Sequence, residues 1–513
     1  MGIKNLSRTY SAELEGVNAR IVEVEVDMNV GLHSFNIVGL PDKALSEARE
    51  RVNSALKNSG MKPPNRENRK ITINLAPAGI KKAGPNYDLA IALGYLLATK
   101  QIAPFATDKK LFVAELALDG RLRPVNGALN ITEAAMKAGF AEIFLPQRNA
   151  GEAAAIDGIA VISVESLAEA IAHCEGRKKI GAARREAPAA ARGKESAGDL
   201  ADIAGQGNAK RALVIAAAGG HNLLMIGPPG VGKSMLAHAL PGILPDLTRE
   251  EAVEVTKIWS AAGLCPGTII TDRPFRAVHH TSSTIAVLGG GSDPRPGEIS
   301  LAHRGALFLD ELPEFPRSVL EALREPLESG SILISRSKQS LVFPAKFALI
   351  AAMNPCPCGY YGDPEGECKC SAYEVVKYQK KISGPLLDRI DIQIKVGRIK
   401  IEALQDAASR ENAGSAAREA VARARDAQAK RFADSAITTN AEMTSREAEE
   451  AALLDPRAKQ FMGTLDARRL SPRGYYRVLK VARTIADIES STRVSAEHAA
   501  EAFSYRLRDL FSA

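Results

Sequence analysis

The sequence has few aromatic residues, a single tryptophan and no long apolar segment. Phe, Trp and Tyr make up 5% of the 513 residues, so a surface that binds nucleic acid mainly by stacking bases on aromatic rings is not expected. No apolar run reaches the length of about 18 residues that a membrane helix needs. The first residues, MGIKNLSRTYSAELEG, lack the apolar core of a signal peptide. These absences favour a cytoplasmic protein without a membrane span.

Cysteine is also scarce, with six residues in the chain, and four of them fall within residues 356–370. Disulfides are rare in the cytoplasm, so such a cluster is more typical of a metal site or of inert thiols than of cross-links. The net charge of +7, with a pI near 9.0, is compatible with a polyanionic partner but does not require one. A chain of this length predicts about two to four domains.

Composition and the periodicity of apolar residues divide the chain into four segments. Residues 1–173 alternate strand-like and helix-like patterns, such as the alternating RIVEVEVDMNV and the hairpin-like LFVAELALDGRLRPV, and predict an α/β domain. Residues 174–197 are rich in Lys and Arg and poor in large apolar side chains, as expected of a solvated basic linker, with an arm that contacts DNA as the less favoured alternative. Residues 198–397 predict a second α/β domain with a parallel sheet, and residues 398–513 predict a helical domain.

A glycine-rich segment gives the strongest functional signal. The strand-like LLMI precedes it, a helical pattern begins at Met235, and residues 227–234 satisfy G-x-x-x-x-G-K-[ST]. Glycines let backbone N–H groups turn toward phosphate oxygens, and the helix N-terminus attracts the same charge. Lys233 is expected to neutralise phosphate charge and Ser234 to ligate Mg²⁺. The predicted nucleotide-binding residues are Gly227, Pro228, Pro229, Gly230, Val231, Gly232, Lys233 and Ser234.

Two further strand-like segments end in polar residues suited to hydrolysis. GALFLDELPEF leads to Asp310, placed to hold Mg²⁺ together with Ser234, and to Glu311, placed to polarise the attacking water as a general base. FALIAAMN ends in Asn354, whose amide is suited to orienting the water or sensing the γ-phosphate. Ligands of open α/β sheets bind at the carboxyl ends of the strands, so these residues are expected to meet the glycine-rich segment there.

Two arginines complete the pattern. GPLLDRIDIQI contains Arg389 before another strand-like run, and LSPRG places Arg473 at the start of a helix in the last segment. Free arginines near a nucleotide stabilise the charge of the transferring phosphoryl group, an effect of roughly 10³–10⁵ in rate. Neither arginine is informative alone. The order and spacing of the whole set make both of them candidate catalytic residues.

The ordered set resembles that of AAA+ ATPases, which have Walker A and Walker B segments, a sensor-1 asparagine, an arginine finger and a sensor-2 arginine in a helical lid. Two longer segments narrow the resemblance to the magnesium-chelatase-like branch, and within it to the bacterial ComM/YifB competence family. They are RPFRAVHHTSSTIAVLGGGSDPRPGEISLAHRGALFLDELPEF and AAMNPCPCGYYGD. The resemblance covers nearly all of the chain. It implies an α/β fold class with a ribosomal-S5/Lon-like N-terminal domain over residues 1–173, an AAA+ P-loop parallel-sheet core and a C-terminal helical lid.

The resemblance also implies an activity and partners. It implies hydrolysis of ATP with Mg²⁺ in a homo-hexameric ring, in which Arg389 of one subunit reaches the ATP of its neighbour, whereas Arg473 acts in cis or in trans. The implied task is sequence-independent translocation on branched or single-stranded DNA, that is, helicase-driven branch migration that assists the integration of transforming DNA by homologous recombination.

Two segments are candidates for contacting DNA in the channel of such a ring. One is residues 279–298, whose glycines suit a mobile loop, and the other is residues 329–347, which resemble a hairpin with Arg336 and Lys338 near its tip. Basic loops bind phosphates without reading sequence, although a solvated hairpin has the same pattern. His279-His280 are not expected to be metal ligands, because adjacent side chains point apart in most backbones, so packing or nucleotide sensing is favoured.

Cys356, Cys358, Cys368 and Cys370 match the ligand count of a tetrahedral zinc site. Their C-x-C spacing is tighter than the usual C-x₂-C, so reduced thiols without a metal and a redox pair stay open as alternatives. A structural Zn²⁺ there would fasten the loop that joins Asn354 to the region of Arg389. Cys174 and Cys265 are isolated in the sequence.

Two other functions compete with the DNA motor. A chelatase-type ATPase chaperone would drive insertion of a metal into a tetrapyrrole, but the additional N-terminal domain argues against it. A Lon-like protease is suggested by the expected N-terminal fold, yet such proteases carry a nucleophilic serine after Gly-Pro. Here KKAGPNYDLA has Asn86 at that position, so protease activity is not expected.

Overall fold

The structure is a computed structural model, and it divides the chain into two compact units. The first comprises Met1–Ala190 with Arg249–Ile270, and the second comprises Ala191–Thr248 with Thr271–Ala513. Arg249–Ile270 therefore belongs to the first unit, although it lies inside the segment that the sequence presents as the second α/β domain. The residues that the structure describes are 6–66, 68–79, 81–185, 198–291, 294–336, 339–399, 413–465 and 470–506.

The first unit contains a sheet with the strand order β1-β2-β4-β3. Its strands are β1 (Leu6–Glu15), β2 (Asn18–Val30), β3 (Ser34–Val38) and β4 (Arg69–Ala76). Apolar residues alternate along β2 and are fully buried on one face, so RIVEVEVDMNV is confirmed as a half-buried strand. That face packs in one core with helices α2 (Ala48–Asn58) and α3 (Asp88–Ala98). The short helix α1 (Lys43–Ser46) and the 3₁₀ turn η1 (Pro64–Arg66) lie between these elements in the chain.

A second, parallel sheet of the first unit has the order β5-β8-β9. The predicted hairpin before β8 forms: Glu115 of β6 pairs with Arg123 of β7, and the turn uses the left-handed Gly120 (φ 85°). The bounds in this part are β5 (Lys110–Phe112), β6 (Glu115–Leu116), β7 (Leu122–Arg123), β8 (Glu142–Pro146), β9 (Ala160–Val164), α4 (Ala128–Lys137), α5 (Gln147–Ala153) and α6 (Leu167–Cys174).

Helix α9 (Arg249–Ala261) belongs to this unit through contacts with α4. Lys257 lies 2.5 Å from Glu133 of α4, and the carbonyl oxygen of Ser260 accepts a hydrogen bond of 2.9 Å from the backbone N–H of Gly127. Gly127 precedes α4, so α9 supplies an acceptor for a backbone donor at the start of that helix.

The second unit is built on a parallel sheet with the order β11-β14-β17-β10-β18. Its strands are β10 (Leu223–Ile226), β11 (Phe275–Val278), β14 (Ala306–Leu309), β17 (Ala348–Met353) and β18 (Ile392–Lys395). The three central strands, β14, β17 and β10, are almost wholly buried, as expected for a parallel sheet covered by other elements. The predicted parallel sheet is thus confirmed. Helices α7 (Gly207–Gly219) and α8 (Lys233–Ile243) pack in its core, and the 3₁₀ turn η3 (Leu200–Asp202) precedes them.

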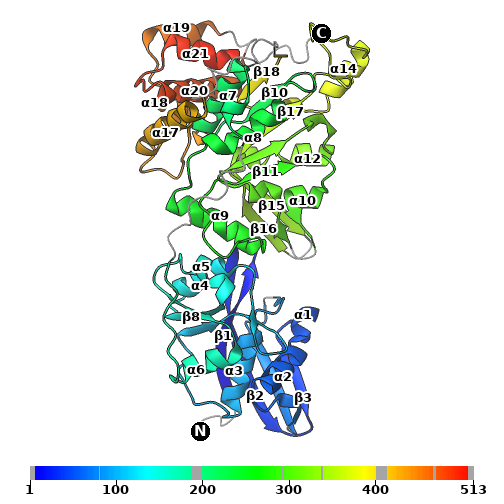
Figure 1. The fold of residues 1–513 in the computed structure, drawn as a ribbon, viewed down its shortest axis with the longest axis vertical. Helices are drawn as coiled ribbons and strands as arrows, with labels where there is room; N and C mark the ends of the chain where they lie inside the picture. Colours follow the sequence, from blue (N-terminus) through cyan, green and yellow to red (C-terminus); the bar gives the residue numbers. More distant parts are fainter. Residues whose placement is uncertain are drawn as a thin grey trace. The chain divides into compact units, whose positions relative to one another are not determined.

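The C-terminal part of this unit is helical, as predicted, and shares its core with α7 and α8. Figure 1 shows this group of helices (orange to red) beside α7 and α8. Ser495 caps the last helix by accepting a hydrogen bond from the His498 backbone N–H. The bounds are α17 (Ala413–Arg431), η5 (Asn440–Glu442), α18 (Ser445–Ala452), α19 (Pro456–Thr464), α20 (Pro472–Ile488) and α21 (Ala496–Ser504).

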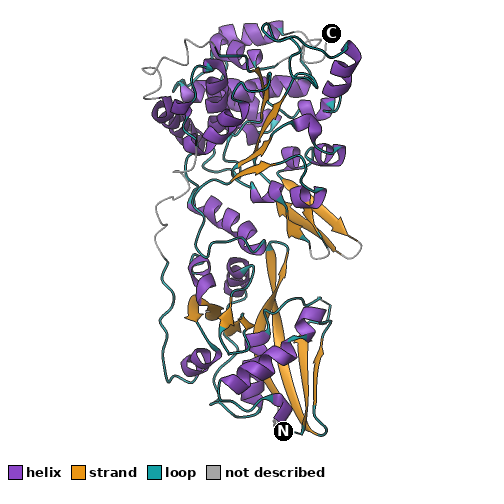
Figure 2. Ribbon diagram, turned by 45° about the vertical axis from the view of Figure 1, so that its right-hand side comes forward, coloured by secondary structure: helices purple, strands orange, loops and turns teal. Residues whose placement is uncertain are grey.

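A separate antiparallel hairpin, β15 (Ser331–Arg336) with β16 (Gln339–Pro344), confirms the hairpin expected near residues 329–347. Figure 2 shows it apart from the parallel sheet. The side chain of Arg336 and the whole of Lys338 lie outside the described residues. The remaining elements are α10 (Thr284–Leu288), β12 (Gly289–Gly290), β13 (Arg295–Pro296), α11 (Glu298–Leu301), η4 (Leu312–Glu314), α12 (Arg317–Ala322), α13 (Pro326–Ser329), α14 (Ala372–Gln379) and α15 (Gly384–Leu387).

Two further expectations from the sequence concern the basic linker and the absence of membrane-spanning helices. Residues 186–197 of the expected basic linker lie outside the described residues. In the part of the chain that the structure describes, helices that combine the length and the apolar character needed to cross a membrane are absent.

Candidate active site

The ends of neighbouring parallel strands bring the predicted hydrolytic residues together. In the register of the sheet, Ile226 of β10 pairs with Met353 of β17, and Leu309 of β14 pairs with Ala351. The residues that follow these strands are Gly227, Asp310 and Asn354. All of them therefore lie at the carboxyl edge of the sheet, the edge at which open α/β sheets bind ligands.

The glycine-rich segment has little room for side chains and an unusual backbone. A Cβ atom on Gly227 would lie 2.1 Å from the carbonyl oxygen of Val396, so only glycine fits there. Gly230 and Gly232 have φ angles of 78° and 89°, in the left-handed region that glycine enters without strain. Gly232 precedes α8, whose first backbone N–H groups are available to a phosphate.

Lys233 is largely buried and bonded within the loop. Its Nζ donates hydrogen bonds of 2.8 Å to the carbonyl oxygens of Gly227 and Pro228 and one of 3.1 Å to Oδ1 of Asn354. Burial lowers the pKa of its ammonium group, and the negative charges of Asp310 and Glu311 oppose that shift. The ammonium group is thus held where phosphate oxygens can replace the carbonyl oxygens as acceptors.

Ser234 and Asp310 are in direct contact, with the Ser234 hydroxyl donating a hydrogen bond of 2.7 Å to Oδ2 of Asp310. Mg²⁺ prefers oxygen ligands, and a hydroxyl beside a carboxylate provides them. These two residues fit the predicted magnesium site, and they would hold the ion together with phosphate oxygens and water.

Glu311 occupies a constrained position next to Asp310. Its φ is 52°, a left-handed value that non-glycine residues rarely adopt. One carboxylate oxygen of Glu311 lies 3.2 Å from Nδ1 of His280, and the Glu311 side chain is 51% exposed. The candidate general base is therefore accessible to water and has an imidazole beside it.

The two adjacent histidines do not point apart, so that expectation from the sequence is wrong. The ring centroids of His279 and His280 are 4.2 Å apart with an interplanar angle of 32°. Nδ1 of His279 lies 2.8 Å from the hydroxyl of Thr281, and a turn following β11 brings the rings together. The contact between His280 and Glu311 is consistent with the role near the nucleotide that the sequence favoured.

Arg389 lies at the opposite edge of the sheet. It precedes β18, and its carbonyl oxygen accepts a hydrogen bond of 2.9 Å from Nδ2 of Asn222, the residue immediately before β10. The phosphate-binding segment begins after the other end of β10. A strand rises about 3.3 Å per residue, so this four-residue strand separates the two places by roughly 13 Å.

The two candidate arginines share one carboxylate. Arg389 pairs with Glu328 and also donates a hydrogen bond of 2.8 Å to the carbonyl oxygen of Pro385. Arg473 lies 3.4 Å from the other carboxylate oxygen of Glu328. The Arg389 side chain is 9% exposed, whereas that of Arg473 is 64% exposed. The hydrogen bond from Arg389 holds the pKa of Glu328 below its usual range, so Glu328 is ionised at neutral pH.

A buried carboxylate anchors the backbone next to Arg389. Asp391 pairs with Arg477 of α20 and accepts a hydrogen bond of 3.0 Å from the backbone N–H of Asn222, and His221 lies 3.5 Å away. Burial raises the pKa of Asp391, but Arg477 and His221 outweigh that effect, and its pKa lies well below the ordinary range. Arg477 also donates a hydrogen bond of 3.1 Å to the carbonyl oxygen of Arg389. Helix α20 thus positions this backbone directly.

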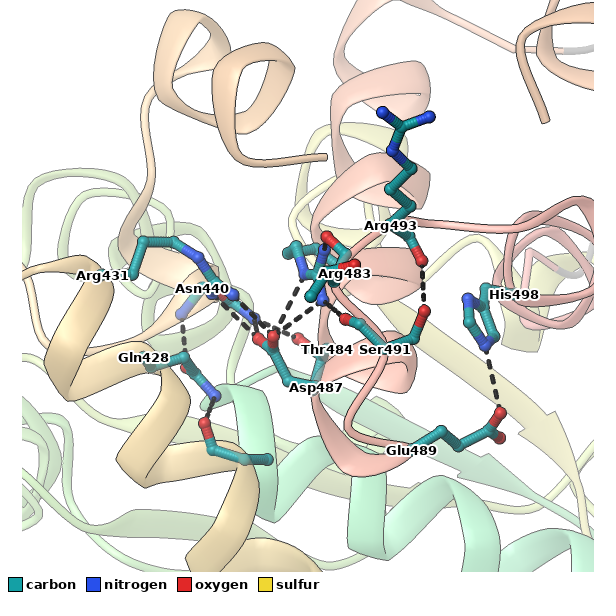
Figure 3. Close-up of polar contacts among 12 residues, drawn as sticks. Gln428, Arg431, Asn440, Arg483, Thr484, Asp487, Glu489, Ser491, Arg493 and His498 are labelled. Carbon is teal, nitrogen blue, oxygen red and sulfur yellow. Dashed lines mark hydrogen bonds and ion pairs between the residues drawn. The ribbon is translucent and has the colours of Figure 1, made fainter. Parts of the chain in front are cut away.

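A polar network around the buried Asp487 joins the C-terminal helices to one another (Figure 3). Asp487 of α20 accepts hydrogen bonds from Arg431 of α17 and from Arg483 one turn earlier. The Thr484 hydroxyl lies 2.8 Å from Nε2 of His221, whose other nitrogen faces Asp391. Polar contacts therefore run from α17 through α20 to the strand that follows Arg389.

The four clustered cysteines converge in the loop after β17. Every pair of their sulfur atoms lies within 4.8 Å, and the separations from Cys356 to Cys358 and to Cys368 are 3.4 and 3.7 Å. A regular tetrahedron with Zn–S bonds of about 2.3 Å has sulfurs about 3.8 Å apart, so the sulfurs fit this ion. A hydrogen bond from the Tyr360 backbone N–H lowers the pKa of Cys358 to about 6, which favours a thiolate at that one position, whereas burial and the neighbouring sulfurs raise the pKa of Cys368 and of Cys370. The cluster contains Cys356, Cys358, Cys368 and Cys370.

This cysteine loop lies against the phosphate-binding segment. Gly359 has a φ of 89°, and a Cβ atom there would lie 2.6 Å from Cδ of Pro229. On the loop's other side, Arg398 pairs with the buried carboxylate of Asp363 at 3.0 Å. A metal ion that orders the cysteines would therefore also order the surface that contacts the phosphate-binding segment.

Sequence reasoning missed two carboxylates near Arg389. Glu328 pairs with Arg389 itself, and Asp391 pairs with Arg477, which donates a hydrogen bond to the Arg389 carbonyl oxygen. Asp391 had a weak signal, since a carboxylate alternates with isoleucine in the strand-like IDIQI. Glu328 had none, because its pairing depends on the tertiary fold.

Comparisons with known proteins agree with this site. The family described as "Magnesium chelatase, subunit ChlI" matches residues 199–404, "Subunit ChlI of Mg-chelatase" matches residues 24–149, and "Magnesium chelatase, subunit ChlI C-terminal" matches residues 411–506.

Individual proteins match over almost the full chain. The "Competence protein ComM" of Haemophilus influenzae is 42% identical over 510 residues, which cover 98% of this chain and 97% of that protein. The "Uncharacterized protein YifB" of Escherichia coli is 42% identical over 507 residues, 98% of each chain. The "Magnesium-chelatase 38 kDa subunit" of Rhodobacter capsulatus is 29% identical over 171 residues, 30% of this chain and 49% of that protein. The chain belongs to the ComM/YifB family of magnesium-chelatase-like AAA+ ATPases.

Proposed function

We propose that the chain is an ATP-hydrolysing motor that assembles into a homo-hexameric ring and translocates on DNA, driving branch migration during homologous recombination of transforming DNA. The observation that carries the proposal is the placement of its charged groups. Lys233, Ser234 and Asp310 lie at the carboxyl edge of the parallel sheet, whereas Arg389 precedes β18 at the amino edge.

The chemistry follows from the residues at the carboxyl edge. Lys233 exchanges its carbonyl acceptors for phosphate oxygens, and the N-terminus of α8 and the glycine N–H groups bind the remaining charge. Mg²⁺, when bound at Ser234 and Asp310, neutralises charge that develops on the phosphates. Glu311 takes a proton from the attacking water, and Asn354 orients that water. The contact with His280 restricts the movement of the Glu311 carboxylate.

The position of the arginines supports a ring. Roughly 13 Å of strand separates Arg389 from the phosphate loop of its own chain, and Glu328 binds Arg473 beside it. Because both cations lie on the side away from their own nucleotide site, each is suited to the nucleotide of a neighbouring copy. We therefore propose that Arg473 acts in trans together with Arg389, stabilising the charge of the transferring phosphoryl group.

DNA is the proposed substrate for three reasons. The relative named "Competence protein ComM" is similar along 98% of the chain. The β15–β16 hairpin and residues 279–298 are the candidate segments for phosphate contacts in the channel, and the pI is near 9.0. Residues 279–298 contain α10 and the paired strands β12 and β13, and so are not the simple mobile loop that the sequence suggested. Such contacts carry no sequence information, which suits a motor that passes along any DNA.

We further propose that the cysteine cluster binds one structural Zn²⁺. The four sulfurs already have separations close to those of a tetrahedral site, and Cys356 is buried. Through Gly359 and Pro229 the ordered loop would fix one wall of the nucleotide site.

A chelatase-type ATPase chaperone is the second candidate, because the matching family descriptions name subunits of magnesium chelatase. The chelatase subunit of Rhodobacter capsulatus covers only 30% of this chain, whereas the ComM relative covers 98%. The longer match favours the motor. DNA dependence of the ATPase distinguishes the two functions.

The deciding experiment measures the ATPase rate of the full chain with no DNA and with single-stranded, duplex and forked DNA, together with native mass in the same buffers. The expected result is a rate that rises with forked or single-stranded DNA, accompanied by a particle of six chains. A chain that hydrolyses ATP at one rate in every condition and stays monomeric would contradict the proposal, and a rate that ignores DNA in an assembled ring would favour the chaperone.

A further inference from the structure

We propose that Glu328 is a positioning residue that retains Arg389 within its own protomer and connects both candidate arginines to the β15–β16 hairpin. The inference rests on the proposed function, because it takes Arg389 and Arg473 as the groups that reach a neighbour's nucleotide and the hairpin as the DNA contact. It adds to that function a route by which DNA controls hydrolysis.

The first observation is that both terminal nitrogens of the Arg389 guanidinium group already have acceptors. One terminal nitrogen donates a hydrogen bond of 2.8 Å to the Pro385 carbonyl oxygen, and the other pairs with Glu328. With its side chain only 9% exposed, Arg389 has little surface left for a phosphate from another chain. It must leave Glu328 before it can act in trans.

The second observation is that Glu328 stands at the base of the hairpin. It lies in α13, which ends at Ser329, and β15 begins at Ser331 after the left-handed Gly330 (φ 69°). The Gly330 carbonyl oxygen accepts a hydrogen bond of 2.8 Å from the backbone N–H of Ala345, just beyond β16.

The base of the hairpin is also tightly packed. A Cβ atom on Gly330 would lie 2.7 Å from Cγ of Lys346, and Nζ of Lys346 lies 2.8 Å from Glu442. Close packing transmits displacement because it leaves no space to absorb it. A movement of the hairpin therefore displaces Glu328.

The third observation concerns charge. One carboxylate accepts from two guanidinium groups, so this cluster of three side chains keeps a net positive charge that attracts an anion. Charge-assisted hydrogen bonds from arginine to carboxylate and to phosphate are of the same type. The free energy for exchanging Glu328 for a neighbour's phosphate is thus close to zero. A small displacement of α13 then decides which acceptor Arg389 uses.

The test compares the wild-type chain with Glu328→Gln, which removes the charge, and Glu328→Ala, which removes the acceptor. Glu325→Gln is the matched control, since Glu325 precedes the same short helix, is exposed and undergoes the same change in charge. The first readout is modification of Arg389 by phenylglyoxal, quantified by peptide mass spectrometry without nucleotide or DNA. The second is kcat and KM for ATP with and without forked DNA.

Both Glu328 variants should raise the modification rate of Arg389 at least about threefold, because a hydrogen bond between charged groups is lost. They should also raise the DNA-free kcat by a similar factor with little change in KM, and so reduce the stimulation by DNA. Glu325→Gln should match the wild type in all of these measurements. A purely structural role would not raise kcat.

The two readouts separate the possible failures. If Arg389 is modified at the wild-type rate in both Glu328 variants, or if its modification rises while DNA-free kcat does not, the inference is overturned. If the wild-type chain shows no DNA-dependent ATPase, the proposed function fails, whereas phenylglyoxal still reports whether Glu328 retains Arg389.

Discussion

The Oδ1 atom of Asn354 lies 3.1 Å from Nζ of Lys233, although 121 residues separate them in the chain. The contact joins the end of β17 to the start of α8 across the carboxyl edge of the sheet. A phosphate that draws Lys233 away from its carbonyl acceptors also changes the partner of Asn354. Nucleotide binding is therefore expected to change a contact of Asn354, the residue from which the loop with the four cysteines starts.

Substitutions in the phosphate loop and at Glu311 should separate binding from hydrolysis. Lys233→Ala should weaken ATP binding roughly 10- to 100-fold, since a hydrogen bond to a charged group contributes about 1.5–3 kcal/mol. Glu311→Gln should bind ATP normally and hydrolyse it roughly 10²–10⁴ times more slowly, because the general base is lost. Fluorescent-nucleotide titration and phosphate release measure the two effects. Glu314→Gln, three residues beyond Glu311 and exposed in its pair with Lys381, is the control and should hydrolyse ATP at the wild-type rate. Unchanged turnover in Glu311→Gln refutes its assignment as the base.

Arg389→Ala should assemble, bind ATP and lose roughly 10³-fold in kcat, as for other arginines that stabilise a transferring phosphoryl group. Mixing it with Lys233→Ala should restore part of the activity, because an intact phosphate loop can then face an intact arginine across an interface. Phosphate release is measured at fixed total protein while the mixing ratio varies, and each variant alone is the control. A linear dependence on the ratio, without a maximum, argues that Arg389 does not act between chains.

Cys356→Ser should lower the zinc content from about one atom per chain, measured by elemental analysis after a chelator wash. It should also weaken ATP binding, because the loop that presses Gly359 onto Pro229 loses its order. Gly359→Ala should weaken binding with the zinc retained, since its Cβ atom collides with Pro229. Cys174→Ser is the control: burial raises the pKa of that thiol to about 12, and it lies outside the cluster. Full-strength nucleotide binding by metal-free protein would show that the loop does not support the site.

Asp391→Asn should reduce the free energy of unfolding by about 3 kcal/mol, because it leaves the half-buried Arg477 without its buried counter-charge. The folded-state pKa of Asp391 is depressed, so its stabilising effect is complete above the unfolded pKa of about 4. That effect is lost as the pH falls below this value. Urea unfolding from pH 8 to pH 3 should therefore give a constant difference between wild type and variant down to about pH 4 and a smaller one below it. Asp388→Asn, at a half-exposed site, is the control. A difference that grows on acidification would contradict the sign of the shift.

The sequence predicted the strand ends well and the arginine contacts poorly, for a physical reason. LLMI, GALFL and FALIAAM are apolar runs with polar residues directly after them, and such runs specify both a buried strand and the edge at which its last residue lies. The pairing of Arg389 with Glu328 joins residues 61 apart through an exposed carboxylate. Nothing in local periodicity distinguishes that glutamate from its neighbours. The close approach of the His279 and His280 rings likewise depends on one turn, which the general preference of adjacent side chains to point apart does not predict.

The place of helix α9 in the chain determines when the first unit can finish folding during synthesis. The chain completes its first compact unit only with Arg249–Ile270, after the glycine-rich loop and α8. A ribosome that has released residues 1–190 has yet to synthesise Lys257 and Ser260, which contact Glu133 and Gly127. Truncation at the apparent domain boundary would therefore leave a folding unit with an uncovered helix. A deletion that begins at residue 198 would leave α9 without the surface on which it packs, so neither half can be excised by a single cut.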